Sequence, residues 1–140
     1  MKQLIVLTAI LPLMLIFIAQ ITLEQKNNAA ISMLQQQVYT AKEQAKQEGC
    51  FTEDIINRLK TDISTNLGIS KSEILITATE VPQYRINYFD SSSERGLIHY
   101  SVSVPIEKIM AGGSLIGISA ADNKGVYTVE GTAASEKVPD

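Results

Sequence analysis

LIVLTAILPLMLIFIA, from Leu4 to Ala19, is the stretch that decides the fold of this 140-residue chain. Its apolar side chains are interrupted only by Thr8 and Pro12, and no charged residue occurs between Gln3 and Leu23. A helix crosses the hydrocarbon core of a bilayer with about 20 mainly apolar residues. The stretch therefore predicts a membrane anchor over residues 1–23.

Two alternatives to a permanent anchor stay open. A cleaved secretory signal needs a basic start, an apolar core of about 7–15 residues and a small-x-small cleavage site. Lys2 supplies the basic start, but the core is longer and Phe17–Ala19 places a bulky residue where a small one is needed. A buried core helix would require the remaining residues to cover a helix that is apolar on every face. We favour the anchor.

The flanking charges predict how the anchor is oriented. Lys2 and the terminal amine precede it, whereas Glu24 and Lys26 follow it and the next basic residue is Lys42. This small bias in positive charge predicts a single-pass protein of the cell membrane, with its N-terminus inside and its C-terminal domain outside.

The segment from Glu24 to Glu48 predicts that the helix continues beyond the membrane. It contains no Pro or Gly and is rich in Gln, Lys, Glu and Ala, which are good helix formers. Its apolar residues recur every three or four positions and form a stripe on one helical face: Ile31, Leu34, Val38, Ala41 and Ala45. We expect one helix from about Gln3 to Glu48, ended by Gly49. It would comprise the anchor (1–23) and an amphipathic continuation (24–48).

The stripe has two interpretations. It can pack against the chain's own globular domain, or it can bind helices of partner subunits as in a coiled coil. The second makes Ile31, Leu34, Val38, Ala41 and Ala45 candidate partner-binding residues.

Residues 49–140 predict a small α+β domain. A second helix starts after Thr52, a good N-cap, with Glu53 and Asp54 in its first turn, and it ends at Gly68. Its apolar face comprises Ile55, Ile56, Leu59, Ile63 and Leu67.

The period of the sequence then changes from 3.6 to 2, which is typical of strands. We expect a small antiparallel sheet of three to four strands, at Ile74–Thr79, Tyr84–Phe89, Leu97–Val104 and Val126–Ala133. Pro105 should end the third strand. Ile106–Ile118 should be a loop or short helix folded against the sheet, and the tail Ser135–Asp140 should fray.

Composition excludes several classes of function. The net charge of −3 and the absence of a basic stripe argue against nucleic-acid binding. The single histidine, His99, is out of phase with its strand's apolar face, and no cluster of metal ligands or catalytic motif accompanies it. We expect no enzyme, no cofactor and no small-molecule substrate. The single cysteine, Cys50, reads as a half-buried structural residue, with an intermolecular disulfide or a lipid attachment as alternatives.

This layout resembles the type IV pilin plan, and most closely the TadE-like minor pilins or pseudopilins of tight-adherence pili. The resemblance covers the anchor and Gln/Ala-rich helix, Leu4–Glu48, and the C-terminal pattern of a strand at Ile98–Val104, an irregular apolar segment and a strand at Tyr127–Glu136. It implies a membrane-anchored structural subunit of a tight-adherence or type IV-like pilus or secretion assembly. Its partners would be the bilayer, through Leu4–Leu23, and other pilin-like subunits or assembly-machine proteins.

The chain departs from type IV prepilins at its N-terminus. No Gly or Ala cleavage site precedes Leu4, and the apolar segment lacks the Glu that follows the cut in that family. The resemblance thus implies an accessory subunit that a prepilin peptidase does not process. An anchored extracytoplasmic binding or scaffold domain of the cell envelope is the alternative.

Overall fold

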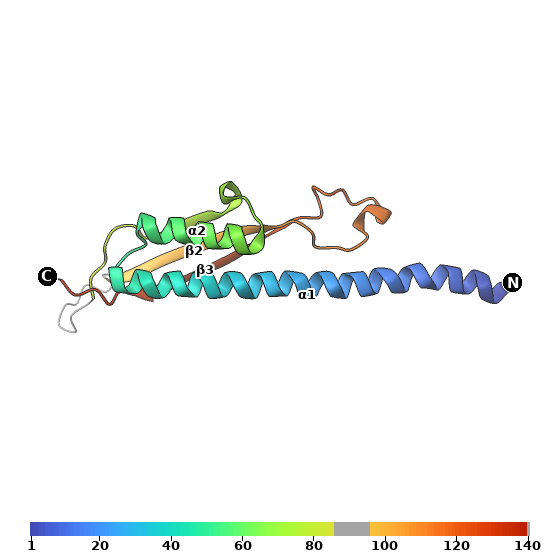
Figure 1. Cartoon of the computed structure of the whole chain (residues 1–140), viewed down its shortest axis with the longest axis horizontal. Coiled ribbons are helices and arrows are strands. Elements are labelled where there is room, and N and C mark those ends of the chain that lie inside the picture. The colour runs from blue at the N-terminus through green and yellow to red at the C-terminus, as the bar shows by residue number, and fades with distance from the viewer. Residues whose placement is uncertain (86–95, 140) are drawn as a thin grey trace. The chain divides into compact units, whose positions relative to one another are not determined.

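The chain folds as α+β, as the sequence predicts (Figure 1). The computed structural model describes residues 1–85 and 96–139. Along the chain the elements are α1 (Lys2–Glu48), α2 (Glu53–Leu67), a 3₁₀ turn η1 (Lys71–Glu73), β1 (Leu75–Ala78), β2 (Leu97–Ile106), a 3₁₀ turn η2 (Gly113–Ile116) and β3 (Gly125–Ala134).

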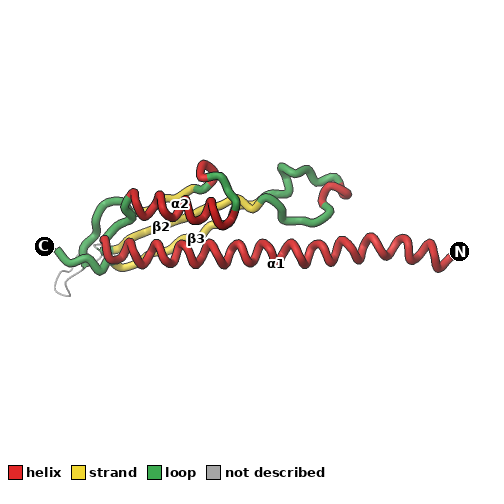
Figure 2. Tube along the Cα trace, viewed as in Figure 1, coloured by secondary structure: helices red, strands yellow, loops and turns green. Residues whose placement is uncertain are grey.

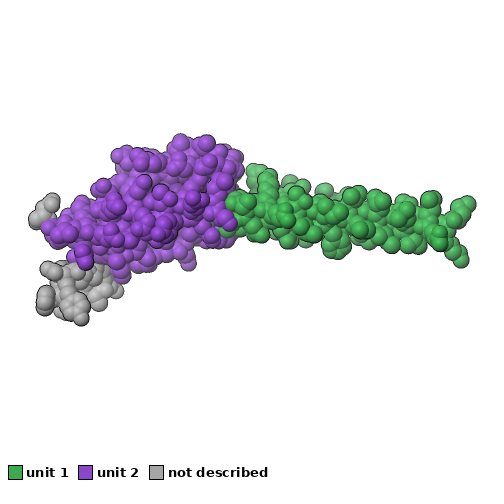
Figure 3. Space-filling view, turned by 60° about the horizontal axis from the view of Figure 1, so that its bottom comes forward, with its two compact units in different colours: residues 1–31, 106–126 green, residues 32–105, 127–140 purple. Residues whose placement is uncertain are grey.

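Two compact units share these elements (Figure 3). The anchor unit comprises residues 1–31 and 106–126, and the core unit comprises residues 32–105 and 127–140. The whole connection between β2 and β3 belongs to the same unit as residues 1–31 of α1.

α1 is one helix, and it ends where the sequence predicts. It continues through Pro12 and stops at Glu48. Gly49 follows with a φ of +84°, a left-handed conformation that glycine adopts without strain. Its N–H donates to Ala45 O at 2.8 Å. A Cβ at Gly49 would lie 2.5 Å from Gln83 O, so the position also requires the smallest residue.

Both predicted caps of α2 are confirmed. Thr52 is the N-cap, and its hydroxyl oxygen accepts a 3.3 Å hydrogen bond from Ile55 N–H. Gly68 is the C-cap, with a φ of +67°, and its N–H donates to Ser64 O at 3.0 Å. These local signals set both ends of the helix.

The three strands form one antiparallel sheet in the order β1-β2-β3. They are yellow in Figure 2. β1 pairs with β2 from Leu75↔Ser103 to Ala78↔Tyr100. Side-chain pairs join β2 to β3: Ser103 Oγ lies 2.8 Å from Thr128 Oγ1, and His99 Nδ1 lies 2.9 Å from Thr132 Oγ1. Successive partners run in opposite directions along the two strands, as antiparallel pairing requires.

The prediction that Pro105 ends the strand is wrong, because β2 continues to Ile106. The pairing with β1 stops at Ser103, so the missing N–H of Pro105 removes no hydrogen bond from that side of β2.

α1, α2 and the sheet contribute to one core in the core unit. The largest fully buried side chains are Leu34, Val38, Phe51, Ile63, Ile74, Ile98 and Val102. As predicted for β2, Ile98, Val102 and Val104 are buried and Tyr100 packs against them, whereas His99 is exposed. The Tyr100 ring also lies 5.8 Å from the Phe51 ring, measured between centroids.

Two further expectations are wrong. The segment after β2 contains a short 3₁₀ helix, η2, as expected, but the segment does not fold against the sheet. It hydrogen-bonds to α1 within the anchor unit, where Asn27 Nδ2 donates to Lys108 O at 2.9 Å. The tail is held in place at Ser135–Lys137, where Glu136 N–H donates to Lys46 O at 2.8 Å and buried Ser135 donates through its hydroxyl to Gln83 O at 2.6 Å.

Of the predicted strand at Tyr84–Phe89, Tyr84 and Arg85 are not in a strand, and the rest lies outside the described residues.

Gly49→Ala should destabilise the core unit more than Gly68→Ala. Both glycines have left-handed conformations, which cost another residue about 1–2 kcal/mol. A Cβ at Gly68 would meet nothing within 4 Å, whereas one at Gly49 meets Gln83 O at 2.5 Å. This clash should add about 1–3 kcal/mol.

The measurement is urea unfolding of the full chain in detergent micelles, followed by the near-ultraviolet circular dichroism of its tyrosines. An equal decrease in the free energy of unfolding in the two variants would contradict the close approach of Gln83 to Gly49.

Candidate functional site

The N-terminal half of α1 presents apolar side chains in every direction. Ile16 and Leu23 are partly buried, and its other large hydrophobic side chains are exposed within the chain: Leu4, Ile5, Val6, Leu7, Ile10, Leu11, Leu13, Met14, Leu15, Phe17, Ile18 and Ile21. Among the described residues, α1 is the one helix long and apolar enough to cross a membrane, and none of its most apolar window is buried. This is consistent with single-pass anchoring, because a soluble protein would leave this surface in contact with water.

The predicted partner-binding stripe contributes mainly to the chain's own core. Leu34 and Ala45 are 0% exposed, and Val38 and Ala41 are at most 5% exposed. Ile31 is partly buried. The structure thus realises the first interpretation of the stripe, in which it packs against the chain's own domain. Periodicity alone does not separate the two interpretations, since either partner requires the same apolar face.

A groove between α1 and α2 was not identified from the sequence. It has a volume of about 310 Å³ and is lined by Met33, Gln36, Gln37, Thr40, Ala41, Gln44, Ile55, Arg58, Leu59, Asp62 and Asn66. In the described part of the chain, Gln37 Oε1 is buried there without a hydrogen-bond partner. In the sequence, the glutamines of α1 that line the groove look like residues of an ordinary solvated helix face. The sequence therefore carried no specific signal for the groove.

Charged residues connect the end of α1 to the C-terminal tail. Lys46 Nζ lies 2.9 Å from Glu136 Oε1 and 3.1 Å from Glu43 Oε2. Lys46 donates these hydrogen bonds, and acceptance by the Glu136 carboxylate, followed by that of Glu43, raises the pKa of Lys46. The hydrogen bonds that Glu43 accepts from Lys42 and Lys46 lower the pKa of Glu43. The side chains of this cluster are exposed to solvent, so their ion pairs contribute little to the stability of the fold.

The outer face of the sheet carries short polar side chains and His99. As predicted, His99 is exposed, and its Nδ1 pairs with Thr132 Oγ1 at 2.9 Å. Across residues 1–85 and 96–139, no three His, Cys, Asp or Glu side chains are grouped as metal ligands would be. The polar row on β2 and β3 therefore has the character of a hydrated surface.

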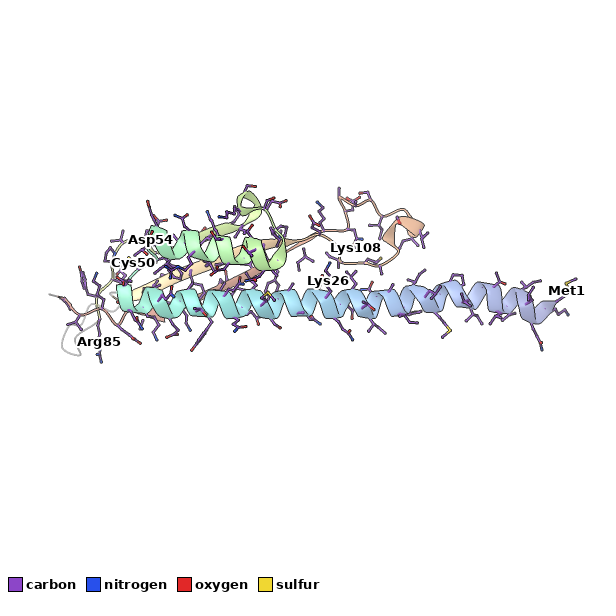
Figure 4. All side chains as sticks on the ribbon, viewed as in Figure 1. Met1, Lys26, Cys50, Asp54, Arg85 and Lys108 are labelled. Atoms are coloured by element: carbon purple, nitrogen blue, oxygen red, sulfur yellow. The ribbon has the colours of Figure 1, made fainter. Side chains whose placement is uncertain are left out.

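Cys50 lies in the connection between α1 and α2 (Figure 4) and is 5% exposed, more buried than the sequence predicts. Burial raises the pKa of its thiol. The thiolate is the reactive form of cysteine. Both features make Cys50 a structural residue with low reactivity at neutral pH.

Cys50 should react slowly with a maleimide reagent in the folded chain and rapidly in denaturant. The rate of mass gain at pH 7, with and without urea, measures this protection. Tyr39→Cys in a Cys50→Ala background provides an exposed reference, because Tyr39 is 59% exposed. Native Cys50 reacting as fast as this reference would contradict its burial.

Comparison with known proteins identifies no family for this arrangement. The chain matches no protein-family model, no curated protein and no solved structure. A functional argument therefore depends on the chain's own residues, of which the exposed apolar half of α1 has the clearest physical requirement.

Proposed function

We propose that this chain is a membrane-anchored, pilin-like structural subunit of a tight-adherence or type IV-like pilus or secretion assembly. Its apolar helix lies in the bilayer, with the N-terminus inside and the core unit outside. It acts by packing this helix against the helices of partner subunits.

The observation that carries the proposal is the difference in burial between the two halves of α1. One continuous helix, Lys2–Glu48, leaves most apolar side chains of its N-terminal half exposed and uses its C-terminal half as part of an α+β core. This is the plan of pilin-like subunits, which the sequence resembles. The uncovered half can contact lipid in a monomer and other helices in an assembly.

Because the amphipathic stripe is already buried, the span itself is the surface we assign to subunit packing. Lipid tails are as apolar as leucine, so helices associate in a bilayer through close van der Waals contact. Small residues favour such contact, and the span has Thr8, Ala9 and Ala19 among its large side chains.

Disulfide crosslinking in native membranes tests this assignment. Leu11→Cys and Leu13→Cys, in a Cys50→Ala background, place thiols about 200° apart around the helix at 3.6 residues per turn. Pilin-like packing is heterologous, since one face of each subunit contacts a different face of the next. The double variant should therefore form a ladder of dimers, trimers and larger species on mild oxidation.

Leu75→Cys with Val138→Cys is the matched control, since both side chains are exposed in the core unit and outside the span. Added lipid should reduce any crosslinks that arise from chance collisions, but not a specific ladder. A species that stops at dimers would indicate a two-fold contact. A chain that stays monomeric at every pair of positions in the span would contradict the proposal and favour an anchored binding or scaffold domain.

A further inference from the structure

In the part of the chain that the structure describes, the connection between β2 and β3 has several exposed apolar side chains. We call residues 106–126 the hairpin loop. Leu115 and Ile116 of η2 are 75% and 71% exposed, and Ile109 and Met110 are 48% and 41% exposed. Charged residues lie toward the two ends of the loop, at Glu107, Lys108, Asp122 and Lys124. Exposed apolar patches rimmed by polar residues mark sites of interaction with proteins or membranes.

Side-chain amides of α1 hold the hairpin loop along the helix. Asn27 Nδ2 donates to Lys108 O at 2.9 Å. Figure 4 labels Lys108 on the loop and Lys26, the residue before Asn27, on α1. Gln20 bonds twice: its Nε2 donates to Ile109 O at 3.2 Å, and its Oε1 accepts from Ala111 N–H at 2.8 Å. A Cβ at Gly112 would lie 3.6 Å from Ile16 Cγ1. The loop thus follows α1 from Asn27 toward Ile16.

This path takes the loop to the depth of the span. The uncharged segment of α1 ends at Leu23, and Ile16 lies two helical turns inside it, a rise of about 10 Å. A bilayer core is about 30 Å thick. When α1 crosses the membrane, Gly112 and the adjoining η2 therefore lie within the leaflet on the side of the core unit.

Several backbone groups of the loop are hydrogen-bonded within the loop, which lowers the cost of moving them out of water. Asn123 makes three such bonds: its Oδ1 accepts from Ile109 N–H at 3.1 Å and from Met110 N–H at 2.7 Å, and its Nδ2 donates to Met110 O at 2.8 Å. Within the tip, Leu115 N–H donates to Gly112 O and Ile118 N–H donates to Gly113 O, each at 2.9 Å.

We propose that the hairpin loop is a second membrane-contacting element, whose tip at Leu115 and Ile116 inserts among lipid acyl chains beside α1. This inference rests on the membrane anchoring within the proposed function, and not on the pilin-like assembly. We choose lipid as the occupant because the apolar tip continues the lipid-facing surface of the span, and its depth follows from the contacts with Gln20 and Ile16.

Tryptophan quenching by brominated lipids tests the proposal, since the chain contains no tryptophan. Leu115→Trp should fold, because Leu115 is 75% exposed. In phosphatidylcholine vesicles containing the full chain, it should show blue-shifted emission and lose most of its intensity to lipids brominated in the upper acyl chain. Phe17→Trp is the control within the span, and Tyr39→Trp is the control in water.

Each outcome has a defined meaning. Emission from Leu115→Trp that is red-shifted and unquenched, while Phe17→Trp is quenched, would overturn the insertion of the loop. Blue-shifted emission without bromine quenching would also overturn it, since the tip would then lie against another copy of the chain. Absence of quenching at Phe17→Trp would instead overturn the anchoring, and the proposed function with it.

A second substitution tests how the loop is held. Asn123→Ala removes three hydrogen bonds to the loop and should reduce the quenching of Leu115→Trp, whereas the neighbouring Lys124→Ala should leave it unchanged. Equal quenching in the two variants would overturn the assignment of Asn123 as the residue that braces the inserted tip.

Discussion

The burial of one face of α1 against α2 and β2 is the contact on which the rest of the structure depends. Leu34, Val38, Ala41 and Ala45 supply this face, and each fully buried Leu or Val contributes about 1.5–3 kcal/mol by leaving water. Further toward its N-terminus, the same helix has apolar side chains that the described residues leave mostly exposed. α1 therefore combines a buried face in the core unit with an exposed apolar segment.

Local signals in the sequence predicted the helices and most of the sheet. Thr52 and Gly68 were identifiable because a cap depends on a few adjacent backbone groups. The strand containing Ile98 and Val102 was identifiable because alternation is a local pattern. The extension through Pro105 was missed, since it depends on where β1 stops pairing, which is a property of the sheet and not of the proline.

Features that rest on long-range polar contacts were not predictable. Gln20 and Asn27 read as ordinary residues near the end of a span, yet they hold the hairpin loop. Ser135 reads as part of a polar tail, yet it is buried with its hydroxyl bonded to Gln83 O. For the candidate site, composition was enough to predict the helix that is long and apolar enough to cross a membrane. Periodicity identified the stripe at Leu34 and Val38 without showing what would cover it.

The pairing of an early helix with a late sheet has a kinetic consequence for synthesis. Leu34 and Val38 emerge from the ribosome long before Ile98 and Val102, which cover the same core. At about 5–20 residues per second, the interval is roughly 3 to 14 seconds. α2 follows the stripe closely in the chain and can pack against it early, but the part of the core that β2 completes lacks its partner throughout that time. Early occupation of that part by another molecule would block the entry of β2, so it has to stay free until β2 has been synthesised.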